Sequence, residues 1–336
     1  MTKVRVIGGG AWGTALAAVL ADNGHDVLLW AREPEVVQSI NDQHRNELFL
    51  PDVDLPEALK ATSELSLAAA DAQVLVNVVP SQHVRSVWSG IAASVPKSAL
   101  VVSASKGIET TTLERMDQVM EELLPPEAFR GFSVVSGPSF AREVGQRQPT
   151  LVVAASRDLE AAERVQGLFQ NRYLRVYTNT DVIGVELGGA LKNVMALAAG
   201  VASGLGFGHN TLAALITRGL AEMTRLGVAM GARPETFAGL AGMGDLVLTC
   251  TGSLSRNRTV GVRIGQGERP EAILGEMRAV AEGVKTVLAV HELSRKYGVE
   301  MPISEQVHAM LTEGLPPREA LDNLMSRAPR SEDWTS

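Results

Sequence analysis

The first half of the chain alternates short apolar runs with longer segments of helical periodicity. Seven runs rich in β-branched residues are predicted to be strands, at residues 4–7, 26–30, 73–78, 99–103, 132–135, 150–154 and 174–177. Several of these runs are continuously apolar, which is typical of parallel strands covered on both faces. Helical segments lie between them, notably at 12–23 and 113–124. This alternation predicts an α/β fold with a doubly wound parallel sheet.

After about residue 180 the β-rich runs stop and the composition becomes helical. We therefore predict an α/β domain over 1–180, an all-helical domain over 181–327 and a flexible tail over 328–336. The stretch 187–217 is strongly apolar, and Gly200, Gly204 and Gly208 have the spacing that lets helices approach closely. Glycines and polar residues at 206–210 interrupt any span of about 20 residues. We expect two buried helices there and no membrane span.

Composition excludes several classes of function. The chain has 31 Lys and Arg against 38 Asp and Glu, a formal charge of −7, which disfavours a general nucleic-acid binder. Cys250 is the only cysteine and the six histidines lack ligand-like spacing, so we expect no disulfide and no metal site. No segment near the N-terminus has the apolar length of a signal peptide. The expected location is the cytoplasm.

A glycine-rich turn follows the first predicted strand. Residues 8–13 read Gly-Gly-Gly-Ala-Trp-Gly, which places Gly8, Gly10 and Gly13 in the register of G-x-G-x-x-G before a predicted helix. In this fingerprint the first glycine allows a tight turn, the second lets the backbone approach a pyrophosphate, and the third lets the helix pack on the strand. The helix N-terminus offers free N–H groups to the anion. The pattern predicts a dinucleotide site.

The end of the second strand discriminates between the two nicotinamide cofactors. Arg32 follows that strand and suits the 2′-phosphate of NADP(H), whereas Glu33 one place later would suit the 2′-hydroxyl of NAD(H). We favour NADP(H), and NAD(H) stays open, as does a reading of Arg32 as an exposed strand end.

Two isolated charges lie in apolar helical segments. Lys192 is the sole charge in 187–217, and Asp245 is the sole charge between Glu235 and Arg256. A buried ammonium needs a partner and tends toward a lower pKa, which makes Lys192 a candidate for proton transfer. If a helix begins at Asp245, Thr249 lies on the same face. The alternatives are a snorkelling lysine and a helix-capping aspartate.

Polar groups also gather at loops. Residues 255–257 place a hydroxyl, a guanidinium and an amide together, a group that suits a phosphate or carboxylate. Lys106 and the loop 136–141 each follow a predicted strand, where ligands of open α/β sheets bind, and residues 78–81 are predicted to form a wall of the cofactor site.

The set of motifs, in this order, resembles a bacterial-type NAD(P)-dependent glycerol-3-phosphate dehydrogenase over roughly residues 3–325. The motifs are residues 8–13 with Trp12, the loop 46–56 with its two Leu-Pro pairs, and 105–107, 136–141, 191–193, 242–246, 255–257 and 280–283. Ala11 stands where this family often has serine, at a position that acts largely through its backbone. The resemblance implies a Rossmann-like domain, a helical domain of the 6-phosphogluconate dehydrogenase C-terminal type, and a cleft between them.

The resemblance also implies a reaction, the reversible interconversion of dihydroxyacetone phosphate and sn-glycerol 3-phosphate for phospholipid synthesis. Lys192 is then the general acid/base, oriented by Asp245. The implied substrate-binding residues are Lys106, Gly137, Ser139, Lys192, Asn193, Asp245, Ser255, Arg256 and Asn257. The implied cofactor-binding residues are Gly8, Gly10, Ala11, Trp12, Gly13, Arg32, Lys106, Ala141, Arg256, Val280 and Glu282.

Two other classes of function share some of these features. A dehydrogenase acting on a carboxylate, such as a β-hydroxyacid dehydrogenase or ketopantoate reductase, would share the fingerprint and the helical-domain lysine. A non-catalytic sensor of NADP(H) would not need Lys192 and Asp245 in apolar helices. The expected partner is a small-molecule substrate, and a homodimer is the base-rate expectation for the assembly.

Overall fold

The computed structural model describes residues 1–69, 71–277, 281–329 and 332. The chain forms two compact units. The first comprises Met1–Lys106 and Glu114–Val185, and the second comprises Gly107–Leu113 and Glu186–Ser336. A short internal segment thus belongs to the unit that otherwise follows much later in the chain.

Within the described residues, the first unit is built on one eight-stranded sheet with the order β3-β2-β1-β4-β5-β6-β7-β8. Its strands are β1 Lys3–Ile7, β2 Asp26–Trp30, β3 Lys60–Thr62, β4 Val74–Asn77, β5 Leu100–Ser103, β6 Ser133–Ser136, β7 Thr150–Ser156 and β8 Leu174–Asn179. All seven predicted strands are present, and the predicted doubly wound α/β fold is confirmed. The three-residue edge strand β3 was not predicted.

One step of the sheet departs from the predicted parallel arrangement. Strand β7 runs antiparallel to β6, with Ser133 opposite Ser156, and every other neighbouring pair is parallel. Runs that are buried on both faces have the same apolar composition in either direction, so the pattern alone does not give the direction of β7.

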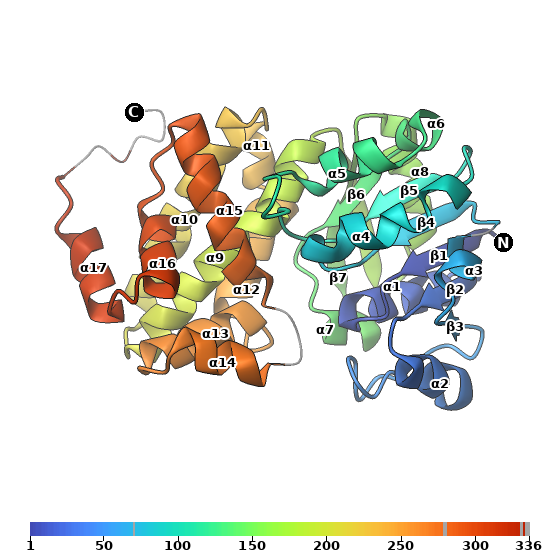
Figure 1. Ribbon diagram of the computed structural model, residues 1–336, viewed down its shortest axis with the longest axis horizontal. Helices are drawn as coiled ribbons and strands as arrows, with labels where there is room; N and C mark the ends of the chain where they lie inside the picture. The colour runs from blue at the N-terminus through green and yellow to red at the C-terminus, as the bar shows by residue number, and fades with distance from the viewer. Residues whose placement is uncertain (70, 278–280, 330–331, 333–336) are drawn as a thin grey trace. The chain divides into compact units, whose positions relative to one another are not determined.

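Helices cover both faces of this sheet (Figure 1). In chain order they are α1 Ala11–Asp22, α2 Pro34–Gln43, α3 Leu65–Ala69, the short turn η1 Ser81–His83, α4 Val84–Ser89, η2 Ala92–Ser94, α5 Met116–Leu123, α6 Pro126–Phe129, α7 Ala141–Gly145 and α8 Leu159–Phe169. Helix α1 packs with α7 and α8 on one face, and α4, α5 and α6 form a connected group on the other. Helix α5 begins three residues later than predicted, because Leu113 has a positive φ of 62° that no α-helix accommodates.

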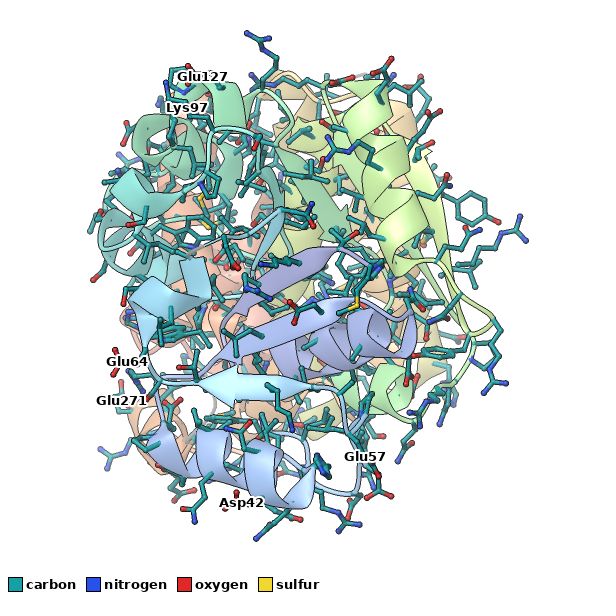
Figure 2. The ribbon with its side chains drawn as sticks, turned by 90° about the vertical axis from the view of Figure 1, so that its right-hand side faces the viewer. Asp42, Glu57, Glu64, Lys97, Glu127 and Glu271 are labelled. Carbon is teal, nitrogen blue, oxygen red and sulfur yellow. The ribbon has the colours of Figure 1, made fainter. Side chains whose placement is uncertain are left out.

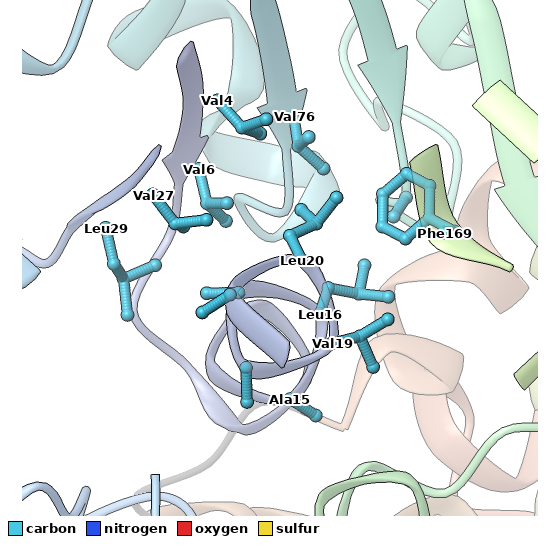
Figure 3. Packing of buried hydrophobic residues seen from close by; sticks show 14 of the residues in the cluster. Val4, Val6, Ala15, Leu16, Val19, Leu20, Val27, Leu29, Val76 and Phe169 are labelled. Carbon is cyan, nitrogen blue, oxygen red and sulfur yellow. The ribbon is translucent and has the colours of Figure 1, made fainter. Parts of the chain in front are cut away.

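Helix α1 is the centre of the core on its side of the sheet. Figure 3 shows Leu20 pointing from α1 toward Val76 of β4, and Leu16 pointing toward the side where Phe169 of α8 lies. All four side chains are fully buried. Burial of this kind stabilises a fold by about 1.5–3 kcal/mol per large aliphatic side chain, and it fixes where the N-terminus of α1 lies relative to the strand ends.

Side-chain amides close both edges of the sheet. On β3, Asn41 donates to the carbonyl of Ala61 and accepts from its N–H. On β8, Asn171 accepts from the N–H of Leu174, and Gln166 donates to the carbonyl of Val176. Exposed strand edges promote association with other chains, and these amides occupy groups that such association would use. Farther along the surface, Lys97 and Glu127 form an exposed ion pair of 3.1 Å (Figure 2).

The second unit is helical in its described residues, as predicted. Its elements are α9 Val182–Gly204, α10 His209–Ala229, α11 Pro234–Phe237, the π-helical turn η3 Leu240–Gly244, α12 Asp245–Thr251, α13 Arg256–Gly265, α14 Pro270–Glu276, α15 Glu282–Tyr297, α16 Pro302–Thr312 and α17 Pro317–Met325. The first turn of α9 belongs to the first unit.

Helix α9 is the central helix of this unit. By length and apolar composition alone it has the character of a membrane span, with a mean hydropathy of 1.4, but 94% of its most apolar window is buried in the protein. The prediction of two buried helices holds for α9 and is wrong for the first half of α10. Residues 209–218 are exposed or partly exposed, and burial begins at Gly219.

Glycines bring α9 and α13 into backbone contact. A Cβ atom on Gly200 would lie 2.1 Å from the carbonyl oxygen of Arg258, and one on Gly261 would lie 2.1 Å from that of Leu197. Gly204 and Gly265 face each other in the same way one turn later. The predicted close approach of helices is therefore correct for Gly200 and Gly204, whereas a Cβ on Gly208 would meet nothing within 4 Å.

A buried carboxylate joins α10 to α16. Glu222 is 2% exposed and accepts hydrogen bonds from the backbone N–H groups of Ile303 and Ser304 and from the Ser304 hydroxyl. It therefore caps the N-terminus of α16, whose first residue, Pro302, has no N–H to satisfy. Burial raises the pKa of Glu222 to about 7, against the lowering effect of these hydrogen bonds and of Arg225.

This raised pKa predicts a pH-dependent contribution to stability. The carboxyl group binds its proton more tightly in the folded chain than in the unfolded chain, so its contribution is full below about pH 4.5 and is lost as the pH rises through about 7. We expect the free energy of unfolding of the wild type, relative to Glu222→Gln, to fall by roughly 3 kcal/mol between pH 4.5 and pH 8. Urea denaturation of both proteins at both pH values measures this difference.

The matched control is Glu305→Gln, since Glu305 is exposed in the first turn of the same helix. It should show no such change. If the free energies of unfolding of the wild type and Glu222→Gln differ by the same amount at both pH values, this carboxyl group titrates as in the unfolded chain.

Candidate functional site

The glycine-rich turn between β1 and α1 has the geometry that its sequence predicts. Gly8 has φ of +126°, a conformation that favours glycine, and a Cβ there would lie 2.7 Å from the carbonyl oxygen of Val78. A Cβ on Gly13 would lie 1.8 Å from the carbonyl oxygen of Gly8, so only glycine lets α1 approach the turn. A Cβ on Gly10 would meet no atom of the described residues within 4 Å. Gly10 therefore presents its backbone to open space.

The N-terminus of α1 is suited to an anion. Gly10 is its N-cap and offers no side-chain cap, and the first turn contains no acidic residue. Nearby, the indole Nε1 of Trp12 is buried without a hydrogen-bond partner among the described residues. Free helix N–H groups, an open backbone at Gly10 and an unpaired indole donor together fit a pyrophosphate-containing cofactor.

Arg32 and Glu33 form an ion pair at the end of β2. The Arg32 side chain is 80% exposed, and its Nη2 lies 2.8 Å from Oε1 of Glu33. Its Nε donates to the same oxygen at 3.1 Å. Both groups that the sequence left as alternatives for the ribose end of the cofactor are thus present and bound to each other.

The predicted polar loops of the first unit come together. Lys106 follows β5, and its Nζ donates to the carbonyl oxygen of Gly137, after β6, at 3.1 Å. The Ser139 hydroxyl donates to the same carbonyl at 3.0 Å, and Ala141 is the first residue of α7. Because β5 and β6 are parallel neighbours, their carboxyl ends lie at one edge of the sheet, and this brings Lys106, Gly137 and Ser139 together.

In the second unit, Lys192 and Asp245 form a buried ion pair. Nζ of Lys192 lies 2.8 Å from Oδ1 of Asp245 and donates at 2.8 Å to the hydroxyl of Thr249. The two charged side chains are 9% and 1% exposed. Helix α12 does begin at Asp245, so the predicted same-face position of Thr249 is confirmed. The carboxylate stabilises the ammonium where water cannot.

A glycine on α9 makes this pair possible. Gly188 lies one turn before Lys192, and a Cβ there would lie 2.4 Å from the carbonyl oxygen of Ala241 in η3. Since η3 leads directly into α12, the missing side chain lets Asp245 reach Lys192. Sequence reasoning missed Gly188. Its position one turn before Lys192 is the signal that could have found it.

Helix α13 begins at the predicted anion group. Ser255 is its N-cap and accepts from the N–H of Arg258. The side-chain amide of Asn257 donates to Oδ1 of Asn193 at 2.9 Å and accepts from the N–H of Gly283 at 3.0 Å. The chain Asn193–Asn257–Gly283 thus links α9, α13 and the start of α15.

Arg256 and Glu282 interact electrostatically beside this chain. Desolvation lowers the pKa of the Arg256 guanidinium, and the Glu282 carboxylate opposes this shift. Val280, which the sequence also assigned to the cofactor, lies outside the described residues. No three His, Cys, Asp or Glu side chains are placed to hold a metal ion in the described parts of the chain.

Both halves of the chain match models of one family. Residues 3–162 match the N-terminal model, and residues 181–322 the C-terminal model, of NAD-dependent glycerol-3-phosphate dehydrogenase. The glycerol-3-phosphate dehydrogenase (NAD(P)+) of Geobacter sp. strain M21 is 57% identical over 330 residues, and that of Geobacter metallireducens is 60% identical over 330 residues. Each alignment covers 98% of both chains.

Solved structures give the same family and a wider fold group. A glycerol-3-phosphate dehydrogenase from Coxiella burnetii is 37% identical, with a TM-score of 0.91 over 97% of this chain and 99% of that one. A ketopantoate reductase from Ralstonia eutropha is 18% identical, with a TM-score of 0.60 over 95% of this chain and 99% of that one. The second likeness concerns the fold alone.

The contact between α9 and α13 predicts a large effect of one methyl group. Gly261→Ala would place a Cβ against the backbone of α9 at Leu197 and Gly200, on the same helix as Lys192. We expect a loss of about 2 kcal/mol or more in the free energy of unfolding, the usual scale for an overpacked core. Urea denaturation measures the loss.

Gly275→Ala is the matched control, because Gly275 lies in α14 and none of the residues that the structure describes comes within 4 Å of its Cβ position. It should be neutral or stabilising. Equal stability of Gly261→Ala and wild type would mean that the two helices separate at little cost.

Proposed function

The chain belongs to the NAD-dependent glycerol-3-phosphate dehydrogenase family, and we propose that it catalyses reversible hydride transfer between NAD(P)H and dihydroxyacetone phosphate. The product is sn-glycerol 3-phosphate, a precursor for phospholipid synthesis. The observation that carries this proposal on the chain itself is the buried ion pair between Lys192 of α9 and Asp245 of α12.

Lys192 is the proposed general acid/base. In the direction of ketone reduction, its Nζ donates a proton to the substrate oxygen as that oxygen becomes a hydroxyl, and in the reverse direction it takes the proton back. Asp245 keeps the ammonium oriented and compensates its charge throughout. The nicotinamide, when bound, supplies or accepts the hydride. Thr249 accepts one of the Nζ hydrogens, which restricts the rotation of the ammonium group.

The N-terminus of α13 is the proposed anchor for the substrate phosphate. Arg256 contributes a guanidinium, Ser255 a hydroxyl and Asn257 an amide, and the helix N-terminus adds its partial positive charge. Asn193 holds the Asn257 amide in place. Anchoring the phosphate fixes the position of the reacting carbon, which is how remote binding energy accelerates hydride transfer.

Further residues are assigned to the two ligands. We assign Lys106, Gly137 and Ser139 to the substrate, with the Lys106 ammonium stabilising negative charge that develops on oxygen. The cofactor is assigned to Gly8, Gly10, Ala11, Trp12, Gly13, Arg32, Lys106, Ala141, Arg256, Val280 and Glu282. Among the described residues, the Gly10 backbone has open space beside it and the Trp12 indole N–H has no hydrogen-bond partner, and both observations support this assignment.

We also propose the domain roles, location and assembly. Residues 1–180 bind the cofactor and 181–327 carry the catalytic lysine. Most of the predicted tail, residues 330–331 and 333–336, lies outside the described residues. A single buried cysteine, Cys250, suits a reducing cytoplasm. The homodimer rests on the frequency of two-fold dimers among soluble oligomers, and light scattering tests it.

The proposed reaction predicts a defined substrate preference. Purified protein with NADPH should turn over dihydroxyacetone phosphate, followed at 340 nm, and should be inactive with unphosphorylated dihydroxyacetone and with ketopantoate. Activity on ketopantoate without activity on the phosphate would place the protein among the carboxylate-reducing enzymes. Cofactor binding without any turnover would favour a non-catalytic sensor of NADP(H).

The role of Lys192 predicts a loss of activity without a loss of cofactor binding. With the true substrate, Lys192→Ala should lose about 10²–10⁴-fold in kcat and still bind NADPH.

The Arg32–Glu33 pair supports a preference for NADP(H). Glu33 weakens this preference, because it holds the Arg32 guanidinium in an ion pair. Arg32→Ala should raise KM for NADPH by roughly tenfold or more, the value of a charge-assisted hydrogen bond, and should leave KM for NADH within about twofold. Glu33→Gln should lower KM for NADPH by up to about fivefold, because it releases the guanidinium from an exposed ion pair. Equal losses for both cofactors in Arg32→Ala would show that Arg32 does not contact the 2′-phosphate.

A further inference from the structure

Asn46 is a buried amide whose hydrogen bonds end on the cofactor turn. It lies in the loop between α2 and β3, in a motif to which the reaction gives no role, and it is fully buried. Its Nδ2 donates to the carbonyl oxygen of Gly9 at 2.9 Å and to the hydroxyl of Thr14 at 2.8 Å. Its Oδ1 accepts from the N–H of Phe49 at 3.1 Å. One side chain thus ties the 46–49 turn to both ends of the Gly9–Thr14 segment.

The bond to Gly9 determines which way the next N–H points. In a trans peptide the carbonyl of one residue and the N–H of the next point in opposite directions. With the Gly9 carbonyl held by Asn46, the Gly10 N–H is directed away from Asn46. The peptide between two glycines has no Cβ on either side to restrict its rotation, so its orientation needs an external constraint.

We propose that Asn46 is a positioning residue for the dinucleotide, which acts by fixing the Gly9–Gly10 peptide so that its N–H faces the cofactor phosphate. The inference rests on the proposed use of NAD(P)H. Gly10 has open space where a Cβ would be, so a ligand can approach the backbone there. Asn46 itself is buried behind the turn and does not touch the ligand.

The hydrogen-bond pattern accounts for asparagine at this position. The site needs two donors toward Gly9 and Thr14 and one acceptor toward Phe49, and a side-chain amide of this length provides all three. Aspartate has the same shape, but it would place a carboxylate oxygen against the Gly9 carbonyl. Thr14 donates weakly to the same carbonyl at 3.4 Å, so it is a secondary constraint.

The test is direct binding of NADPH to the full-length protein without substrate, followed by the fluorescence of the reduced nicotinamide. Asn46→Ala should raise Kd for NADPH by roughly five- to tenfold, since one backbone hydrogen bond of the turn is lost along with its orientation. Thr14→Val, which keeps the bond from Asn46 to Gly9, should raise it by no more than about threefold. In steady-state assays KM for NADPH should rise in parallel, with kcat at saturating NADPH and KM for dihydroxyacetone phosphate within twofold of wild type.

Asn171→Ala is the matched control. Asn171 makes three side-chain hydrogen bonds, to Asn23, Tyr173 and Leu174, at the opposite edge of the sheet. Its loss should lower the melting temperature and leave Kd for NADPH unchanged. If Asn46→Ala lowers only the melting temperature, Asn46 has a structural role and the inference is wrong. If Asn46→Ala does not fold, Asn46→Ser takes its place, because serine is too short to keep the bond to the Gly9 carbonyl, and an unchanged Kd for NADPH in a folded Asn46→Ser overturns the inference.

These outcomes separate the inference from the function on which it rests. Wild-type protein that fails to bind NADPH and NADH contradicts the proposed function. Wild-type binding together with equal binding by the Asn46 variants contradicts the role of Asn46 alone.

Discussion

The buried ion pair of Lys192 and Asp245 is the interaction on which the second unit depends. An ammonium placed in an apolar helix is tolerated only with a partner, and removal of one member of such a pair typically costs about 3–5 kcal/mol. Everything that brings α12 to α9 therefore serves two purposes. Gly188 and the π-helical turn η3 allow the close approach, and the same approach produces a charged group that is available for proton transfer.

Close backbone contact is the common device in both units. In the first, Gly13 packs on Gly8, so the N-terminus of α1 is fixed at the end of β1. In the second, Gly200 and Gly261 place α13 against α9 without intervening side chains. Distances set by backbone atoms vary less than distances set by rotamers, which are free to change. The chain thus uses glycine where a charged or polar group must be held to a fraction of an ångström.

Sequence reasoning recovered what depends on local pattern. The alternation of strands and helices, the glycine fingerprint and the isolation of Lys192 and Asp245 are visible in short windows. It failed where geometry is set by distant partners. The direction of β7 follows from its connection, β3 is three residues long and pairs only at an edge, and the exposure of early α10 depends on what packs nearby. Asn46 meets Gly9 across 37 positions and Asn193 meets Asn257 across 64, and no periodicity reports such contacts.

The segment Gly107–Leu113 has a consequence for synthesis on the ribosome. It leaves the exit tunnel between two parts of the sheet-containing unit, but it belongs to the unit that begins at Glu186. Ile108, which is fully buried in the finished protein, lies in this segment. Domains usually fold in order as they are made. Here one segment that is made together with the earlier unit belongs to the later one. The segment Gly107–Leu113 is therefore synthesised before most of the unit to which it belongs.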